Sequence, residues 1–304
     1  MRVKAFNVLL IAVILLLLFS IYLFIPFNTT DFTSSSPSNS NFSLNSSLNN
    51  SLQFYTNMRF PTTEISYRIE NCPLQRENDM QWAFRILGNE TILHFYPVST
   101  GEEIIVTCQD KKETEGNLFI AGEGGPTNIT IAGEFNVIES GKILLMQDST
   151  CQRPNIAIHE LLHVLGFDHS KNPKNIMYEI SRCDQTIGDD IINFINTIYS
   201  IPDEPDLLFE DASASMHGKY LNINFSIRND GLKDAPETNV KIMANGKDID
   251  NIDIPTTEIG YGRKVSIENI WIKQLNVQEI QFIINTNYSE LNKDNNQVTF
   301  EIKK

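Results

Sequence analysis

Three of the five histidines in this 304-residue chain lie within the twelve residues HELLHVLGFDHS, which begin at His159. His159 and His163 are four residues apart, so in a helix their side chains stack on one face, one turn apart. Gly166 permits a left-handed backbone, which allows the helix to end and the chain to turn sharply. His169 can then return towards the first two histidines. The spacing therefore predicts a helix and a tight turn that bring three imidazoles to one metal ion.

The residues around these histidines favour a catalytic metal site over a structural one. Three neutral imidazoles leave a fourth position for water, which is the open arrangement of catalytic zinc. Water bound to zinc has a pKa of about 7 and is a usable nucleophile. Glu160 can take its proton and later pass it to a leaving amine. The alternatives are a chance cluster and a closed structural metal site, and neither of them requires Glu160.

A methionine, Met177, follows the third histidine in the sequence NIMYE. The pattern HExxHxxGxxH followed by a methionine resembles the signature of the metzincin zinc endopeptidases. Ser170 and the pair Met177–Tyr178 are most similar to the matrixin branch of that family. The resemblance spans roughly residues 54–200. It implies one catalytic zinc with three histidine ligands, a general base, and a methionine turn below the metal, which here are His159, His163, His169, Glu160 and Met177.

The sequence departs from the matrixin pattern at several points. Glu179 stands where matrixins usually have proline. The cysteine motif of the matrixin propeptide is absent, because Cys72 lies in ENCPLQ inside the expected domain. The structural zinc and calcium loops of animal matrixins are not recognisable, so a structural Ca²⁺ is unsupported. The stretch GEGGPT at residues 122–127 is interpreted as a glycine-rich connection.

The N-terminus predicts a membrane anchor. Arg2 and Lys4 precede an uncharged run at residues 5–27, which as a helix would be about 34 Å long and could cross a bilayer. The two basic residues favour a cytoplasmic N-terminus. Residues 1–27 are therefore expected to form a single-pass helix with the rest of the chain outside the cell. The alternative is a cleaved signal peptide and a secreted protein, but the run does not end in a small-x-small site.

The four cysteines predict two disulfide bonds in an exported chain. Cys151 and Cys183 bracket the histidine cluster, so the expected pairs are Cys151–Cys183 and Cys72–Cys108. Four buried free thiols are the alternative. A zinc site made from these cysteines is not expected, because the sequence contains no CxxC pair.

Two folded domains are expected after the anchor. Residues 28–53 are rich in Ser and Asn and are predicted to be a flexible linker. Residues 54–201 carry the strand and helix patterns of a twisted sheet with three helices. Within this domain residues 116–135 are expected to be loop and short strand, and residues 136–146 to form a hairpin that turns at Ser140-Gly141. The patterns predict strands at 62–69, 91–98 and 103–110, and helices at 73–88, from 154 onwards, and at 185–200.

The chain changes character at IPDEPD, residues 201–206. Residues 206–304 consist of short alternating runs, and Asn245-Gly246 is a hairpin turn signal. About seven strands in this stretch predict an immunoglobulin-like β-sandwich. Residues 225–247 and 287–296 resemble CARDB-type modules of microbial surface proteins. The expected fold class is α+β: a metzincin-like catalytic domain, then an all-β sandwich, with an N-terminal transmembrane helix.

These features predict a membrane-anchored, outward-facing zinc metalloendopeptidase that acts on a protein or peptide substrate. An extended peptide is expected to lie against an edge strand, for which Leu118–Ala121 is the candidate. The sandwich is expected to be a spacer or to bind a surface partner. The alternatives are a non-catalytic adhesion protein with a relic zinc domain, and a zinc hydrolase for non-peptide bonds. The net charge of −14 argues against a nucleic acid partner, because a phosphate backbone requires a basic patch.

Overall fold

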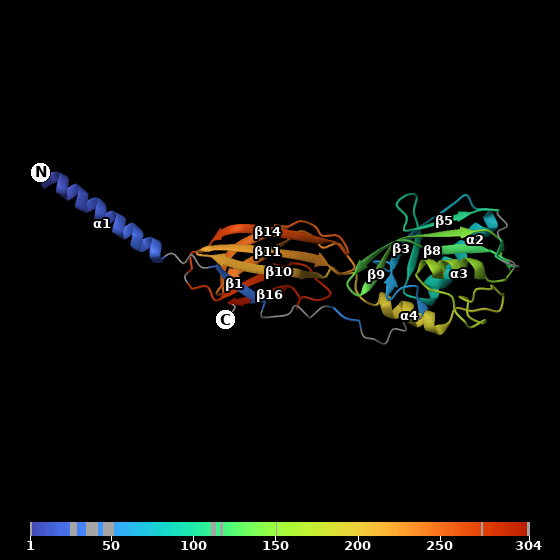
Figure 1. The fold of residues 1–304 in the computed structure, drawn as a ribbon. Coiled ribbons are helices and arrows are strands. Elements are labelled where there is room, and N and C mark those ends of the chain that lie inside the picture. The colour runs from blue at the N-terminus through green and yellow to red at the C-terminus, as the bar shows by residue number, and fades with distance from the viewer. Residues whose placement is uncertain are drawn as a thin grey trace.

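The computed structural model describes residues 2–24, 29–34, 42–44, 52–110, 114–115, 118–149, 151–274 and 276–302. Figure 1 shows a helix at the N-terminus, an all-β module beside it, and a mixed domain of helices and strands beyond. The helix, α1, covers Arg2–Phe24. In the part of the chain that the structure describes, no helix is long and apolar enough to cross a membrane. The predicted anchor at residues 1–27 is therefore not supported.

The mixed domain is built on one sheet. Five of its strands run parallel, and their order is β2-β9-β5-β3-β4. A sixth strand, β8 (Gly122–Ala132), runs antiparallel to β9 and pairs with no other described strand. The parallel strands are β2 (Met58–Arg59), β3 (Glu64–Glu70), β4 (His94–Pro97), β5 (Ile104–Cys108) and β9 (Phe135–Leu145).

Three helices complete the mixed domain, as the sequence predicts. They are α2 (Leu74–Glu90), α3 (Asn155–Val164) and α4 (Asp189–Tyr199). Their apolar faces share one core with the sheet, and this core includes Leu87 of α2, Leu161 of α3 and Ile195 of α4, none of them exposed to solvent. Burial of such side chains stabilises the domain by roughly 2 kcal/mol each.

The predicted hairpin at residues 136–146 is wrong, because β9 runs unbroken from Phe135 to Leu145. The chain turns earlier, at Gly133, which has a φ of 52°. Gly141 serves close packing instead of a turn, since a Cβ there would collide with the side chain of Val164 in α3. The pair Ser140-Gly141 therefore marks the place where β9 packs against α3.

The edge strand also differs from the prediction. Leu118–Phe119 forms β7, which pairs with β6 (Thr114–Glu115) in a separate two-stranded sheet. β8 forms one edge of the main sheet, in the stretch for which the sequence predicts a glycine-rich connection and a short strand. Its glycines hide the alternation that would mark a strand, because they leave few side chains to show which face is buried.

The all-β module has seven strands from the C-terminal part of the chain. Asn245 and Gly246 have φ values of 45° and 72° and form the turn between β12 and β13, as their sequence predicts. The strands are β10 (Leu207–His217), β11 (Tyr220–Asn229), β12 (Thr238–Ala244), β13 (Lys247–Ile254), β14 (Gly262–Trp271), β15 (Glu279–Asn285) and β16 (Gln297–Ile302).

An eighth strand of this module comes from the N-terminal part of the chain. β1 (Thr29–Ser34) lies between β10 and β16 and pairs antiparallel with both, and Figure 1 shows it within the module. Phe32 is buried in the module's core. The stretch 28–53, expected to be a linker throughout, therefore contains a strand that joins two edges of the sandwich.

The position of β1 predicts that the module depends on Phe32. Phe32→Ala should lower the free energy of unfolding of the module by about 3 kcal/mol, because a buried ring is removed. The variant can be followed by urea unfolding with the fluorescence of Trp271, in a Trp82→Phe background. Thr33→Ala is the matched control, since Thr33 lies in the same strand and is exposed. Equal stability of the two variants would contradict the prediction.

Candidate functional site

Helix α3 carries two of the histidines and the glutamate on a buried surface. His159, Glu160 and His163 are only 8%, 6% and 6% exposed. The apolar residues between and beside them, such as Leu161 and Leu162, belong to the domain's core. Packing therefore holds the helix in one orientation, which sets the direction of both imidazoles.

The chain turns back at Gly166, as its position in the motif predicts. Gly166 has a φ of 91°, and its N–H donates to the carbonyl of His163 at 2.9 Å. The next residue, Phe167, donates to the carbonyl of Leu162 at 3.0 Å. A Cβ at Gly166 would lie 2.7 Å from the Cβ of Met58, so a larger residue would also disturb the packing of β2. This turn returns the chain to the face of α3.

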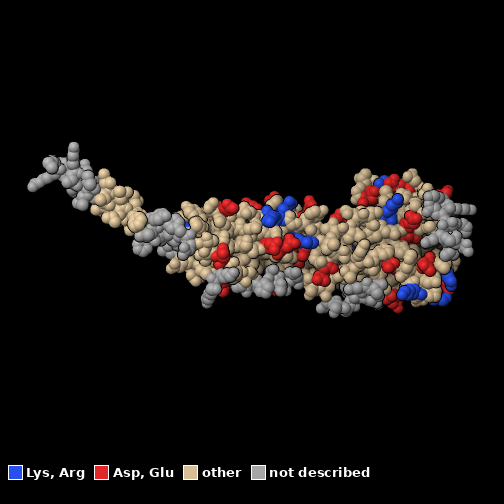
Figure 2. Space-filling view, viewed as in Figure 1, with Lys and Arg blue, Asp and Glu red and all other residues tan. Residues whose placement is uncertain are grey.

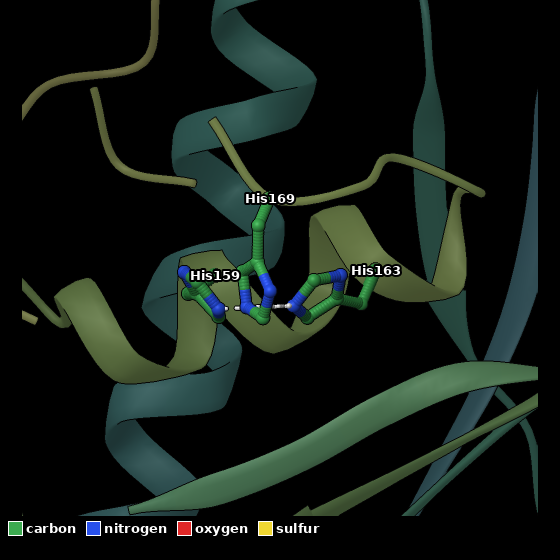
Figure 3. A group of neighbouring side chains, drawn as sticks. All are labelled: His159, His163 and His169. Atoms are coloured by element: carbon green, nitrogen blue, oxygen red, sulfur yellow. Dashed lines mark hydrogen bonds between the residues drawn. The ribbon is translucent and has the colours of Figure 1, made fainter. Parts of the chain in front are cut away.

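The turn brings the three histidines together. Nε2 of His163 lies 2.9 Å from Nε2 of His159 and 3.2 Å from Nε2 of His169, and Figure 3 shows the three rings converging. Tetrahedral zinc with Zn–N bonds of about 2.05 Å would separate two such nitrogens by about 3.3 Å. His169 is exposed, whereas the other two are buried. The cluster therefore has the size of a zinc site that is open to solvent on the side of His169.

The other nitrogens of two of these rings face backbone carbonyls. The carbonyl of Ile176 accepts from Nδ1 of His159 at 2.7 Å, and that of Phe167 accepts from Nδ1 of His163 at 2.8 Å. With the proton on Nδ1, a neutral ring presents a lone pair at Nε2. Burial lowers the pKa of His159 to about 4, and it also lowers the pKa of His163. Lone pairs that face one another at this distance repel unless a cation lies between them, so the donor set fits a metal ion.

The methionine segment, residues 175–178, supports the histidine cluster through its backbone. The carbonyl of Ile176 accepts a hydrogen bond from Nδ1 of His159, and the carbonyl of Met177 accepts from the N–H of Ser170 at 2.7 Å. The side chain of Met177 is buried in the core. The segment itself turns through an Asn175 side chain that accepts from the N–H of Met177 at 2.8 Å. The motif predicts Met177 but not the carbonyl of Ile176, because a backbone group is the same in every residue and leaves no signal in a sequence pattern.

The side chain of Glu160, on α3, lies against β8. Its carboxyl is buried, and this burial raises its pKa to about 8, with the charge of Glu123 adding to the shift. A carboxyl with that pKa carries its proton near neutral pH in the metal-free protein. A cation at the neighbouring histidines would favour the charged form. The state of this candidate base therefore depends on whether the histidine cluster holds a metal.

Two glycines of β8 allow this close approach. A Cβ at Gly122 would lie 2.8 Å from Cγ and 2.9 Å from Oε1 of Glu160, and a Cβ at Gly124 would collide with the backbone of Glu160. The two glycines are two residues apart in β8, so they lie on the same face of the strand, the face towards Glu160. This contact is not predicted by the histidine motif, and its only signal in the sequence is the spacing Gly-x-Gly, which is typical of a strand that lies against another backbone.

Both predicted disulfide bonds are present. Cys151–Cys183 joins the segment before α3 to the segment after Met177, and Cys72–Cys108 joins the start of α2 to the end of β5. Asn155, the first residue of α3, adds a hydrogen bond of 2.6 Å from its side chain to the carbonyl of Arg182. The chain on both sides of the histidine cluster is therefore held covalently and by hydrogen bonding.

Two family models match separate parts of this chain. The matrixin family model matches residues 59–200, and the CARDB family model matches residues 204–300. Interstitial collagenase of Sus scrofa is 31% identical over 166 residues, which cover 49% of this chain and 34% of the collagenase. The chain thus spans about a third of the length of that relative.

A solved CARDB domain from Pyrococcus furiosus, in complex with di-metal ions, is 19% identical to this chain. The similarity covers 33% of this chain and 87% of that domain, with a TM-score of 0.28, and nothing further follows from it. The family matches agree with the two resemblances seen in the sequence. The chain therefore combines a matrixin-like metallopeptidase domain at residues 59–200 with a C-terminal CARDB module at residues 204–300.

Proposed function

We propose that the matrixin-like domain is a zinc-dependent endopeptidase that hydrolyses protein or peptide substrates. The observation that carries this proposal is the convergence of three imidazole Nε2 atoms beside a buried glutamate on the same helix. His159, His163 and His169 would hold the metal. Homology to a collagenase supports the same class of activity at the level of the family.

Each residue of the site would have a separate role in the reaction. Bound zinc would lower the pKa of a water molecule to about 7 and would polarise the substrate carbonyl. Glu160 would accept the proton of that water and donate it to the nitrogen of the leaving amine. The Nδ1 bonds of His159 and His163 keep their rings oriented throughout. Met177 has a structural role in this scheme and does not bind the metal.

Because the pKa of Glu160 is raised, the protonation state of this candidate base would depend on the metal. Without a cation, burial keeps the carboxyl protonated near neutral pH, and a protonated carboxyl cannot accept a proton. A positive charge at the histidines favours the carboxylate. In this scheme a bound metal favours the carboxylate form that a proton acceptor requires.

An extended substrate would lie along β8. This strand pairs with β9 on one side and has no other partner among the described strands, so its second edge offers N–H and C=O groups to a peptide. The end of β8 at Gly122 lies against Glu160, which would bring a peptide on this edge close to the candidate base.

Acidic side chains are spread over both folded parts in the view of Figure 2.

We propose that the protein works outside the cytoplasm. The two disulfide bonds favour an oxidising compartment, and the matrixin homology agrees with this location. Attachment to the membrane by residues 1–27 stays a sequence-based prediction without structural support. Cell fractionation and N-terminal sequencing of the isolated protein would distinguish an attached chain from a secreted one.

The first test of this function is metal content. The full chain is expected to bind one zinc ion, and His163→Ala should weaken the affinity by more than about 100-fold, because one of three ligands is removed. Zinc can be measured by elemental analysis and by competition with a chelator. His94→Ala is the matched control, since His94 is exposed on β4 outside the cluster. Absence of zinc from the wild type, or full retention by His163→Ala, would refute the site.

The second test separates an enzyme from a binding protein. Glu160→Gln is nearly isosteric and leaves all three histidines in place, so zinc and fold should be retained. Peptide cleavage should fall by about 10²–10⁴-fold, because the proton acceptor is lost. Turnover can be measured on a mixed peptide library with and without a chelator. Glu77→Gln, in α2 away from the cluster, should retain the wild-type rate.

Two outcomes of the second test would count against the proposal. Cleavage by Glu160→Gln at the wild-type rate, with zinc bound, would show that Glu160 is not the base. Absence of any chelator-sensitive cleavage by the wild type would favour the alternative, a surface adhesion protein with a relic zinc domain.

A further inference from the structure

The hairpin formed by β8 and β9 reaches out of the matrixin-like domain and contacts the CARDB module. A small core forms at this contact from fully buried Ala132, Phe135 and Val137 of the hairpin and Leu232 of the module. Ile259 and Leu291 of the module pack against it. In Figure 1 the end of the domain marked β9 faces the module. The contact is therefore apolar at its centre and includes residues from both parts.

A polar contact lies next to this small core. Arg228 of β11 donates from a guanidinium nitrogen to the carbonyl of Ile131 in β8 at 3.0 Å. The same guanidinium is held by Asp230 through an Nε–Oδ1 contact of 2.8 Å. The module therefore holds the backbone of β8 directly, through a side chain that its own acidic residue orients. A cavity of about 330 Å³ adjoins the contact and is lined by Arg228, Asp230 and Ile131 among others.

The opposite end of β8 lies at the candidate active site. Gly122 and Gly124 lie against Glu160, whereas Ile131 and Ala132 lie at the module. The strand pairs with β9 from Gly122–Leu145 at one end to Ala132–Phe135 at the other. Register shifts near Asn128 divide the ladder, and pairing continues on both sides of them. A strand of this length spans about 33 Å, so one strand, paired with β9 on both sides of the register shifts, connects two distant places.

We propose that the CARDB module is a positioning element for β8, the edge strand that lies against Glu160. By holding Ile131 through Arg228 and the hairpin turn through Leu232, the module limits the movement of β8 relative to α3. The Gly122–Gly124 end then keeps its close approach to Glu160. Arg228 and Leu232 are positioning residues in this proposal and do not touch the histidine cluster. Its consequence for cleavage rests on the proposed peptidase function.

The test weakens the contact in the full-length protein. Arg228→Gln removes the bond to Ile131 at the surface, and Leu232→Ala removes apolar contact with the hairpin. The control is Ile242→Ala, which truncates a fully buried residue of the module's own core without touching the hairpin. Arg228→Gln keeps the proposal testable if Leu232→Ala does not fold.

The first readout is hydrogen exchange, measured by mass spectrometry, and it does not require enzyme activity. Both contact variants should speed exchange of the amides of residues 122–132 by about 10-fold, including those at the Gly122 end, because the ladder is less restrained. Ile242→Ala should leave this segment within about 2-fold of wild type. Faster exchange confined to residues 129–132, or equal exchange in the control, would overturn the proposal.

The second readout is the effect of each variant on KM and, separately, on kcat for cleavage of an extended peptide. The contact variants should raise KM by about 5-fold or more and lower kcat by a smaller factor, because the edge strand moves while the histidines and Glu160 stay on the packed helix α3. Zinc content should be unchanged. An unchanged KM in both variants would overturn a role in substrate binding. If the wild type cleaves nothing, the proposed function fails, while the exchange experiment still decides whether the module positions β8.

Discussion

The hydrogen bonds from two imidazole rings to the backbone carbonyls of Ile176 and Phe167 are the constraint on which the candidate site depends. They hold the protons of His159 and His163 on Nδ1 and turn both Nε2 lone pairs towards one point. His169 adds a third donor there after the Gly166 turn. Such an arrangement is repulsive without a cation, so the surrounding core has to hold it in place. The buried helix α3, the methionine segment and the Cys151–Cys183 bond each contribute to that support.

The approach of β8 to α3 gives Glu160 its environment. Because glycine leaves no side chain between strand and helix, the carboxyl is buried and its pKa rises to about 8. The same strand extends to the CARDB module, where Arg228 and the small apolar core hold its other end. A strand of the matrixin-like domain therefore contacts the CARDB module directly, although the two family matches are separate in the sequence.

Much of the candidate site was predictable because its parts are close in sequence. The spacing of His159, His163, Gly166 and His169 follows from helix geometry and one turn, and the disulfide pairs followed from their place around this motif. The partners outside the motif were not predictable. Ser140-Gly141 looks like a turn in sequence, yet Gly141 lies inside β9 because Val164 needs the space. The edge strand was expected at Leu118–Ala121 and lies at β8 instead, while the expected anchor at residues 1–27 lacks support.

The sequence by itself determined the local features of this protein: the histidine-bearing helix, the turn at Gly166, the Asn245-Gly246 hairpin and the change to short alternating strands after residue 206. Each depends on periodicity or on backbone conformation within a few residues, which the sequence contains directly. Only the tertiary structure decided that β1 joins β10 and β16, and that β8 links Glu160 to the CARDB module. Strand pairing uses backbone groups that every residue carries, so the partner of a distant strand depends on which apolar faces the whole fold can bury together.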